Sequence, residues 1–359
     1  MRRSAEFRQG MMCGAPAWLA GLGVSVAAGW LCSRIGTPIP WMLGPLVALA
    51  ALRVSGVPVS APPGGRQAGQ WIIGTALGLY FTPHVVHEMH GWWPWLLAGV
   101  VFAIASGYGS GLLLARLAGI DRTTAIFASV PGGASEMAIV GQRFGARVDR
   151  VAAAQSVRIL IVVAVLPAAF TLLDLHGGEM YVPGARVFEP GGFALLMAAT
   201  AAGGALIQWL GVPNAFVLGS LAVAIPLTAG EIDLSAVPAV VSNAGQCLLG
   251  CALGARFEPE FLRGARRFMA AIVASVLAAM AAAAGFGVLV GWLSGLGLAT
   301  VVLGTAPGGF AEMCITAKVL QLGVPVVTAF HVARVVVLLL VTAPLFAALR
   351  RRRAGARRR

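Results

Sequence analysis

Apolar runs long enough to cross a membrane recur from one end of this 359-residue chain to the other. Hydrophobic residues make up 58% of the sequence and charged residues only 11%, whereas soluble domains carry roughly 25% charge. The longest runs are Ala15 to Cys32, Trp92 to Leu114, Ile159 to Leu173, Met269 to Leu293 and Val324 to Leu349. Their length predicts membrane-spanning helices, and they lack the alternation that the strands of a membrane barrel need. We therefore expect an all-α polytopic membrane protein.

The formal net charge of +13 has a local origin. A large part of it comes from a terminal cluster of arginines at 350–353 and 357–359. Such a tail after the last apolar run is typical of a cytoplasmic segment that touches anionic lipid headgroups. Because the tail is short and unpatterned, we expect no direct nucleic-acid binding.

The sequence is an internal duplication. Pro131-Gly132-Gly133-Ala134-Ser135-Glu136-Met137 recurs as Pro307-Gly308-Gly309-Phe310-Ala311-Glu312-Met313, and the same offset of 176 positions aligns Arg158 with Arg334. Nearly the same offset relates Gly74-x-Ala76-Leu77-Gly78 to Gly250-x-Ala252-Leu253-Gly254. We assign 1–12 to a cytoplasmic N-terminus, 13–175 to the first membrane repeat, 190–349 to the second and 350–359 to the arginine tail.

Loop charges predict how the two repeats lie in the membrane. If each half has five spanning helices and a Pro-Gly-Gly segment that re-enters on one side, the basic loops and both termini are cytoplasmic, and the acidic loops Leu173 to Glu189 and Gly230 to Val237 lie outside. The odd number of spans gives the repeats inverted topology. A close alternative makes the Pro-Gly-Gly segment a broken span and Gln70 to Phe81 the re-entrant one. That alternative places the basic loop Arg256 to Arg267 outside.

The Pro-Gly-Gly strings interrupt helices within apolar surroundings. Proline lacks an N–H and glycine disfavours helical order, so the break leaves free backbone groups that lipid cannot satisfy. Glu136 and Glu312 fall at the third position of the following helix, where they can cap its N-terminus. Alternatively, two inverted half-helices direct their positive ends at one solute-binding point near the membrane midplane.

Two arginines strengthen the interpretation of the breaks as a binding site. Arg158 and Arg334 lie inside apolar helices, where an unpaired charge is costly, and Gln155 and His331 share their helix faces. An ion pair with the glutamates that fixes the broken segments is an equally good explanation. The candidate substrate or coupling-ion residues are Pro131, Gly132, Gly133, Ser135, Glu136, Gln155, Arg158, Pro307, Gly308, Gly309, Glu312, His331 and Arg334.

A histidine cluster precedes the second apolar run. His84, His87 and His90 have a spacing that suits a metal ion on a helical turn, but their equivalents in the second half are Glu260, Arg263 and Arg266. We therefore treat them as weak metal candidates in an outer loop and expect no metal and no cofactor. The sequence contains no common nucleophile or nucleotide-binding motif, and we expect no enzyme activity.

The chain resembles the AbrB-type membrane protein duplication family. The resemblance rests on Gly36-Thr37-Pro38-Ile39-Pro40-Trp41-Met42-Leu43-Gly44-Pro45, on Gly74 to Gly78, on the paired Pro-Gly-Gly strings and on Arg158, and it covers nearly the whole chain. Members carry labels such as ammonia monooxygenase or membrane regulator of gene expression. The second half departs in detail, with Asn214-Ala215-Phe216 in place of Ile39-Pro40-Trp41.

The leading hypothesis is a secondary transporter in the bacterial inner membrane, moving a small anionic or amphipathic solute with proton or cation coupling. The alternative is a membrane-bound regulator of gene expression, and a metal-dependent monooxygenase ranks third. The expected partners are the lipid bilayer and the solute, with a homo-oligomer left open.

Overall fold

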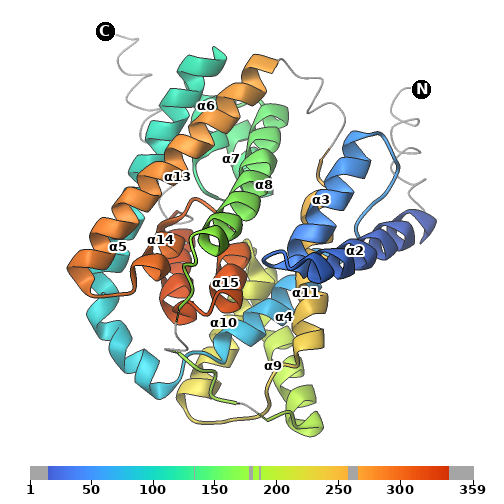
Figure 1. Cartoon of the computed structure of the whole chain (residues 1–359), viewed down its shortest axis with the longest axis vertical. Coiled ribbons are helices and arrows are strands. Elements are labelled where there is room, and N and C mark those ends of the chain that lie inside the picture. Colours follow the sequence, from blue (N-terminus) through green and yellow to red (C-terminus); the bar gives the residue numbers. More distant parts are fainter. Residues whose placement is uncertain (1–14, 133, 178–180, 186, 258–265, 339–359) are drawn as a thin grey trace. The chain divides into compact units, whose positions relative to one another are not determined.

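The fold is described from a computed structural model of residues 15–132, 134–177, 181–185, 187–257 and 266–338 (Figure 1). Every regular element within these residues is an α-helix, in agreement with the predicted fold class. Five helices are long and apolar enough to cross a membrane: Pro16–Ile35, Trp93–Ala118, Val148–Leu172, Pro190–Trp209 and Arg266–Ser294. The chain is thus a helical membrane protein. The predicted N-terminal segment 1–12 and arginine tail 350–359 lie outside the described residues.

The helices form two compact units, and each unit draws on both halves of the sequence. The first unit combines Met1–Glu88, Val163–Arg266 and Cys314–Pro325, and the second combines Met89–Val162, Arg267–Met313 and Val326–Arg359. The two repeats follow one another along the sequence, whereas each packed unit contains segments of both repeats. The repeat boundaries stay a prediction.

Six whole helices of the first unit form two matching sets of three. The helices are α2 (Ala15–Ile35), α3 (Pro40–Val54), α4 (Gly65–Gly78), α9 (Pro190–Trp209), α10 (Ala215–Ala229) and α11 (Ala239–Gly254). Helix α2 packs on α3 as α9 packs on α10, and the sets interlock because α4 packs on α10 while α11 packs on α3. Gly74 and Gly250 bring these interlocked pairs together, because a Cβ at either position would collide with the backbone of Val217 or Met42.

The second unit contains the elements that carry the Pro-Gly-Gly strings. Most of α5 (Pro83–Ala118) and α8 (Val148–Leu172) belong to it, with α6 (Arg122–Ser129), α7 (Ala134–Arg143), α13 (Arg266–Ser294), α14 (Leu298–Thr305) and the start of α15 (Phe310–Val319). The apolar helix Val324–Leu338 contributes its residues from Val326 onward.

Helix bounds follow the duplication seen in the sequence. Helices α6 and α14 each have eight residues, α7 and α15 each have ten, and the members of each pair begin 176 positions apart. Ile39 and Asn214 precede α3 and α10 with the same rare left-handed backbone, at φ of 50° and 55°. The two halves therefore build corresponding elements in corresponding places.

The first Pro-Gly-Gly string connects two helices that fold back on each other. The backbone N–H of Arg147, just past α7, donates to Thr124 Oγ1 in the first turn of α6 over 2.9 Å. The rings of Phe127 and Phe144 stack with centroids 5.9 Å apart between the two arms. The segment from α6 to α7 is therefore a helical hairpin whose two ends lie close to each other.

The interpretation of the histidine cluster as part of a loop is wrong. Helix α5 begins at Pro83, so His84, His87 and His90 lie in its first turns, ahead of Pro94. Proline is well suited to a first helical position because its N–H would have no helical partner there. The helix therefore starts before the apolar run begins.

Candidate functional site

A cavity in the second unit brings the two Pro-Gly-Gly breaks together. Pro131 and Pro307 both line it, as do Arg158 and Arg334. Its walls come from α5, α8 and α13 and from the residues at the ends of α6 and α14. The cavity volume is about 30 Å³, which holds water or a small ion but is far below the several hundred Å³ typical of organic ligand sites.

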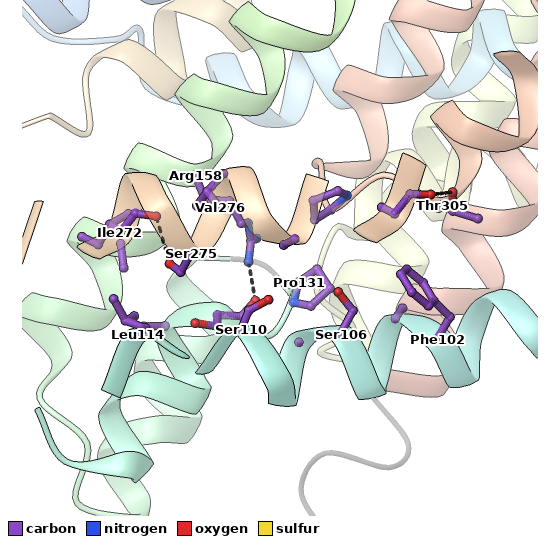
Figure 2. A pocket seen from close by; sticks show the side chains of 18 of the residues that line it. Phe102, Ser106, Ser110, Leu114, Pro131, Arg158, Ile272, Ser275, Val276 and Thr305 are labelled. Atoms are coloured by element: carbon purple, nitrogen blue, oxygen red, sulfur yellow. Dashed lines mark hydrogen bonds between the residues drawn. The ribbon is translucent and has the colours of Figure 1, made fainter. Parts of the chain in front are cut away.

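Arg158 holds the first break through backbone carbonyl groups. Its Nη1 donates to the carbonyl oxygens of Ser129 and Val130 over 3.2 and 3.1 Å, and its Nη2 donates to that of Gly132 over 3.5 Å. The side chain is only 4% exposed and reaches into the space between α5 and α13 (Figure 2). A cation at this point complements the negative end of α6 and satisfies carbonyls that the helix leaves free.

Arg334 repeats this arrangement at the second break. Its Nη1 and Nη2 donate to the carbonyl oxygens of Ala306 and Gly308, each over 2.7 Å. These acceptors are the equivalents of Val130 and Gly132 at the offset of 176. The two arginines thus act first as caps of interrupted helices.

Gln155 and His331 support the same breaks from one turn earlier on their helices. Gln155 Nε2 donates to the carbonyl oxygens of Phe127 and Val130 over 2.9 and 3.0 Å. His331 Nε2 lies 3.2 Å from the carbonyl oxygen of Leu303, the equivalent of Phe127. Both side chains are fully buried. Each shares a helix face with its arginine, as predicted, and both members of the pair bind carbonyl oxygens at the same break.

The second Pro-Gly-Gly string shows why its residue types recur. The Glu312 carboxylate lies against Gly309, in the space that a side chain there would occupy, which is the position of a residue that caps its own helix. Met313 folds over Gly308 in the same way as Met137 folds over Gly132. The small glycines therefore make room for the glutamate and methionine that follow them.

Part of the first string is outside the described residues. This applies to Gly133 and to the side chains of Ser135 and Glu136. Their assignment as binding residues stays a prediction.

Five hydroxyl-bearing residues of the cavity wall were not among the predicted residues. Ser106 and Ser110 lie one turn apart on α5 and Ser275 lies on α13, whereas Ser129 ends α6 and Thr305 ends α14. Four of them, all but Ser129, are labelled in Figure 2. Ser275 and Thr305 donate their protons to backbone carbonyls of Ile272 and Ala283. The spacing of four between Ser106 and Ser110 was the available signal, although small residues at helical spacing more often serve close packing.

The histidine cluster is engaged in other contacts. His84 Nε2 lies 3.2 Å from Glu88 Oε1, and Tyr181 donates its hydroxyl to Glu88 Oε2 over 2.9 Å. Burial raises the pKa of Tyr181 above its usual range, and the Glu88 carboxylate raises it further. Among the described residues, no group of three or more His, Cys, Asp or Glu side chains could hold a metal ion.

Comparison with known proteins identifies the family. The family described as "Transition state regulatory protein AbrB" matches residues 41–350. A Bacillus subtilis (strain 168) protein named "Uncharacterized protein YhjN" is 28% identical over 353 residues, covering 90% of this chain and 91% of its own. An Escherichia coli (strain K12) protein named "Putative regulator AbrB" is 25% identical over 298 residues, covering 82% and 85%. The chain therefore belongs to the AbrB family.

Proposed function

We propose that this protein is a secondary transporter of a small anionic or amphipathic solute. The observation that carries the proposal is the cavity that both Pro-Gly-Gly breaks and both buried arginines line. Interrupted helices leave backbone groups that need protein, water or solute as partners, and they are a recurring way of building solute sites within a membrane. Two guanidinium groups favour a solute that carries negative charge.

The proposed topology has inverted repeats in a bacterial inner membrane with both termini in the cytoplasm. The hairpin formed by α6 and α7 supports a Pro-Gly-Gly segment that re-enters on the side from which it came. Basic residues then gather on the cytoplasmic side and acidic loops outside, in line with the positive-inside bias.

In this proposal, the glutamates that follow the Pro-Gly-Gly breaks couple solute movement to a proton or cation. Glu312 is buried beside the second break, and its charge acts on Arg158. Glu312 lies in the capping position of its own helix, and its charge acts on an arginine that lines the cavity. We therefore choose it as the group that would link solute entry to the movement of a proton or cation.

A transport assay with permanently charged anions tests the proposal. Protein reconstituted into liposomes on a solid-supported membrane is exposed to gradients of sodium chloride, phosphate, methanesulfonate and benzenesulfonate. We expect a transient current for at least one of these salts, a large loss of current in Arg158→Gln and Arg334→Gln, and altered pH dependence in Glu312→Gln. Wild type without any current, or folded arginine variants with full current, would contradict the proposal.

Arg267→Gln is the matched control for the arginine variants. Arg267 also donates to a backbone carbonyl, that of Leu117 over 2.9 Å, but it is exposed and outside the cavity. This variant removes the same charge and the same kind of hydrogen bond. Its current should equal that of the wild type.

A membrane regulator is the second candidate, favoured by the name "Putative regulator AbrB" of the Escherichia coli relative. A regulator acting through the arginine tail would need residues 350–359, whereas a transporter would work without them. Gene-expression profiling of cells that carry the tail-deleted protein separates the two functions. Loss of the expression response with the protein still inserted and the current retained favours the regulator.

A further inference from the structure

We propose that the cavity between the two Pro-Gly-Gly breaks is a binding site for one small monovalent anion, held between Arg158 and Arg334. The inference rests on the proposed function in naming the class of ion that the transport path accepts. It concerns binding and can therefore be tested apart from transport.

Size is the first argument. A cavity of about 30 Å³ has room for water or a small ion, whereas an organic solute would need the surrounding helices to separate. Close packing limits the space, as at Gly107, whose missing side chain leaves room for Pro131 and Val130. A small ion therefore fits the cavity as it stands.

Charge is the second argument. Arg158 and Arg334 act on each other as like charges inside a low-dielectric helical unit, an arrangement that costs free energy. The Glu312 carboxylate lies outside the lining but offsets part of the charge on Arg158. The carbonyl groups that the arginines bind carry dipoles and no net charge. A monovalent anion between the guanidinium groups, together with the Glu312 carboxylate, would balance the two positive charges.

Unused donors are the third argument. Arg158 Nε is fully buried and has no hydrogen-bond partner in the described part of the chain, although the guanidinium lines the cavity. A buried N–H of a charged group rarely stays unpaired, because its desolvation is uncompensated. Ser106 and Ser110 face the same space from α5 and carry hydroxyls that can rotate toward an ion (Figure 2). The wall thus offers donors from two sides.

A cation fits the cavity less well than an anion. Ser275 and Thr305 present acceptor oxygens because their protons are committed to backbone carbonyls. Two neutral hydroxyl oxygens do not outweigh two guanidinium charges. Water alone would satisfy the donors and leave the like-charge repulsion in place.

Bromide is the probe for the test. Detergent-solubilised full-length protein is titrated calorimetrically with sodium bromide against sodium gluconate at constant ionic strength. We expect one saturable bromide site per chain, at least tenfold weaker in Arg158→Gln and Arg334→Gln and unchanged in Arg267→Gln. The absence of saturable binding in folded wild type, or equal affinity in folded Arg158→Gln, overturns the inference.

Two milder variants serve as a control in case the arginine variants misfold. Ser106→Ala and Ser110→Ala leave every carbonyl contact of the arginines in place, and each should weaken bromide binding severalfold without changing the thermal midpoint. If the arginine variants do not fold, these serine variants decide the question, and unchanged affinity in both overturns the inference. Bromide binding without current in the transport assay supports the anion site and overturns the transporter proposal. Current for benzenesulfonate without bromide binding supports the transporter proposal and overturns the anion site.

Discussion

Arginine side chains in apolar helices serve here as caps for interrupted helices. Arg334 binds two carbonyl oxygens over 2.7 Å, and Arg158 binds three over longer distances. Each arginine therefore satisfies backbone groups that its break exposes, and it still lines the cavity. The structural and the solute-binding interpretations concern the same two residues.

Removing Arg334 should destabilise the protein. Arg334→Gln shortens the side chain and leaves the carbonyls of Ala306 and Gly308 without their charged donor, so we expect a loss of about 3 kcal/mol in the free energy of unfolding. Chemical denaturation in mixed micelles measures it. Arg267→Gln, which removes an exposed arginine, should change the value by less than about 0.5 kcal/mol. Equal losses in the two variants would contradict the capping role.

Tyr181 makes the stability of the first unit sensitive to alkaline pH. Burial and the bond to Glu88 raise the pKa of Tyr181, so the folded state holds the phenolic proton more tightly than the unfolded state. Its contribution is complete below the ordinary tyrosine pKa of about 10 and is lost as the pH rises above that value. Thermal midpoints at pH 8 and at about pH 11 should therefore differ less in Tyr181→Phe than in wild type. An equal difference would show that the tyrosine does not contribute.

The sequence indicated which buried polar side chains belong with the two breaks, but it did not indicate the groups that these side chains bind. The offset of 176 pairs Arg158 with Arg334 and Gln155 with His331. In the structure, the first member of each pair contacts the first break and the second member contacts the second break. Backbone carbonyls as acceptors could not be predicted, because a sequence shows which side chains are present and not which main-chain groups a break leaves free. Ser106, Ser110, Ser129, Ser275 and Thr305 were not predicted for a related reason. Hydroxyl groups on apolar helices commonly bond within their own helix, so their residue type does not indicate a cavity.

Short helices are positioned against long ones by single glycines. A Cβ at Gly111 of α5 would lie 2.8 Å from Ile126 Cα, and one at Gly287 of α13 would lie 2.6 Å from Val302 Cα. These positions are equivalent at the offset of 176, and they place α6 on α5 and α14 on α13. The ends of α6 and α14 reach the cavity because of these close contacts.

Alanine substitution tests this packing with internal controls two residues away. Gly111→Ala and Gly287→Ala should each lower the free energy of unfolding by about 1 to 3 kcal/mol, because the obstacle is backbone that cannot rotate away. Gly109 and Gly285 meet nothing within 4 Å, so Gly109→Ala and Gly285→Ala should be neutral or stabilising by up to about 1 kcal/mol. Loss of the distinction between the two pairs, measured by denaturation in micelles, would contradict the packing.

Element bounds could be predicted where apolar runs or breaks define them. Four of the five long runs correspond to long helices, whereas the run Val324 to Leu349 is a shorter helix, Val324–Leu338, as far as the described residues extend. The two Pro-Gly-Gly strings separate α6 from α7 and α14 from α15. The start of α5 could not be predicted, because four of the seven residues at 84–90 are polar and this mixed segment permits a loop as readily as a helix. The docking of Tyr181 on Glu88 depends on contacts between distant parts of the sequence, which periodicity does not reveal.

At the scale of the whole molecule, duplication produces two units with different contents. The first unit interlocks α3 with α11 and α4 with α10, and the second holds both breaks and the arginine-lined cavity. Neither unit can form from one repeat alone, because each needs segments from both halves. The cavity is thus lined by residues from both halves of the sequence.

The proposed topology predicts opposite labelling of two loops. In a variant without the native cysteines, Glu231→Cys should react with a membrane-impermeant maleimide added outside intact spheroplasts, and Arg147→Cys should react only after permeabilisation. Each substitution falls outside the helices, so the fold should tolerate it. Labelling of both positions from the same side would contradict the inverted arrangement.

The central claim is that the two Pro-Gly-Gly breaks meet at one cavity, and cross-linking tests it most directly. Ser129 and Thr305 lie at equivalent positions and line that cavity from opposite repeats. Without native cysteines, Ser129→Cys combined with Thr305→Cys should be joined in high yield by the shortest bis-methanethiosulfonate reagent in native membranes. Ser129→Cys combined with Gly285→Cys, at an open surface position, should not be joined. A cross-linking yield for the first pair no higher than that for the second would contradict the account.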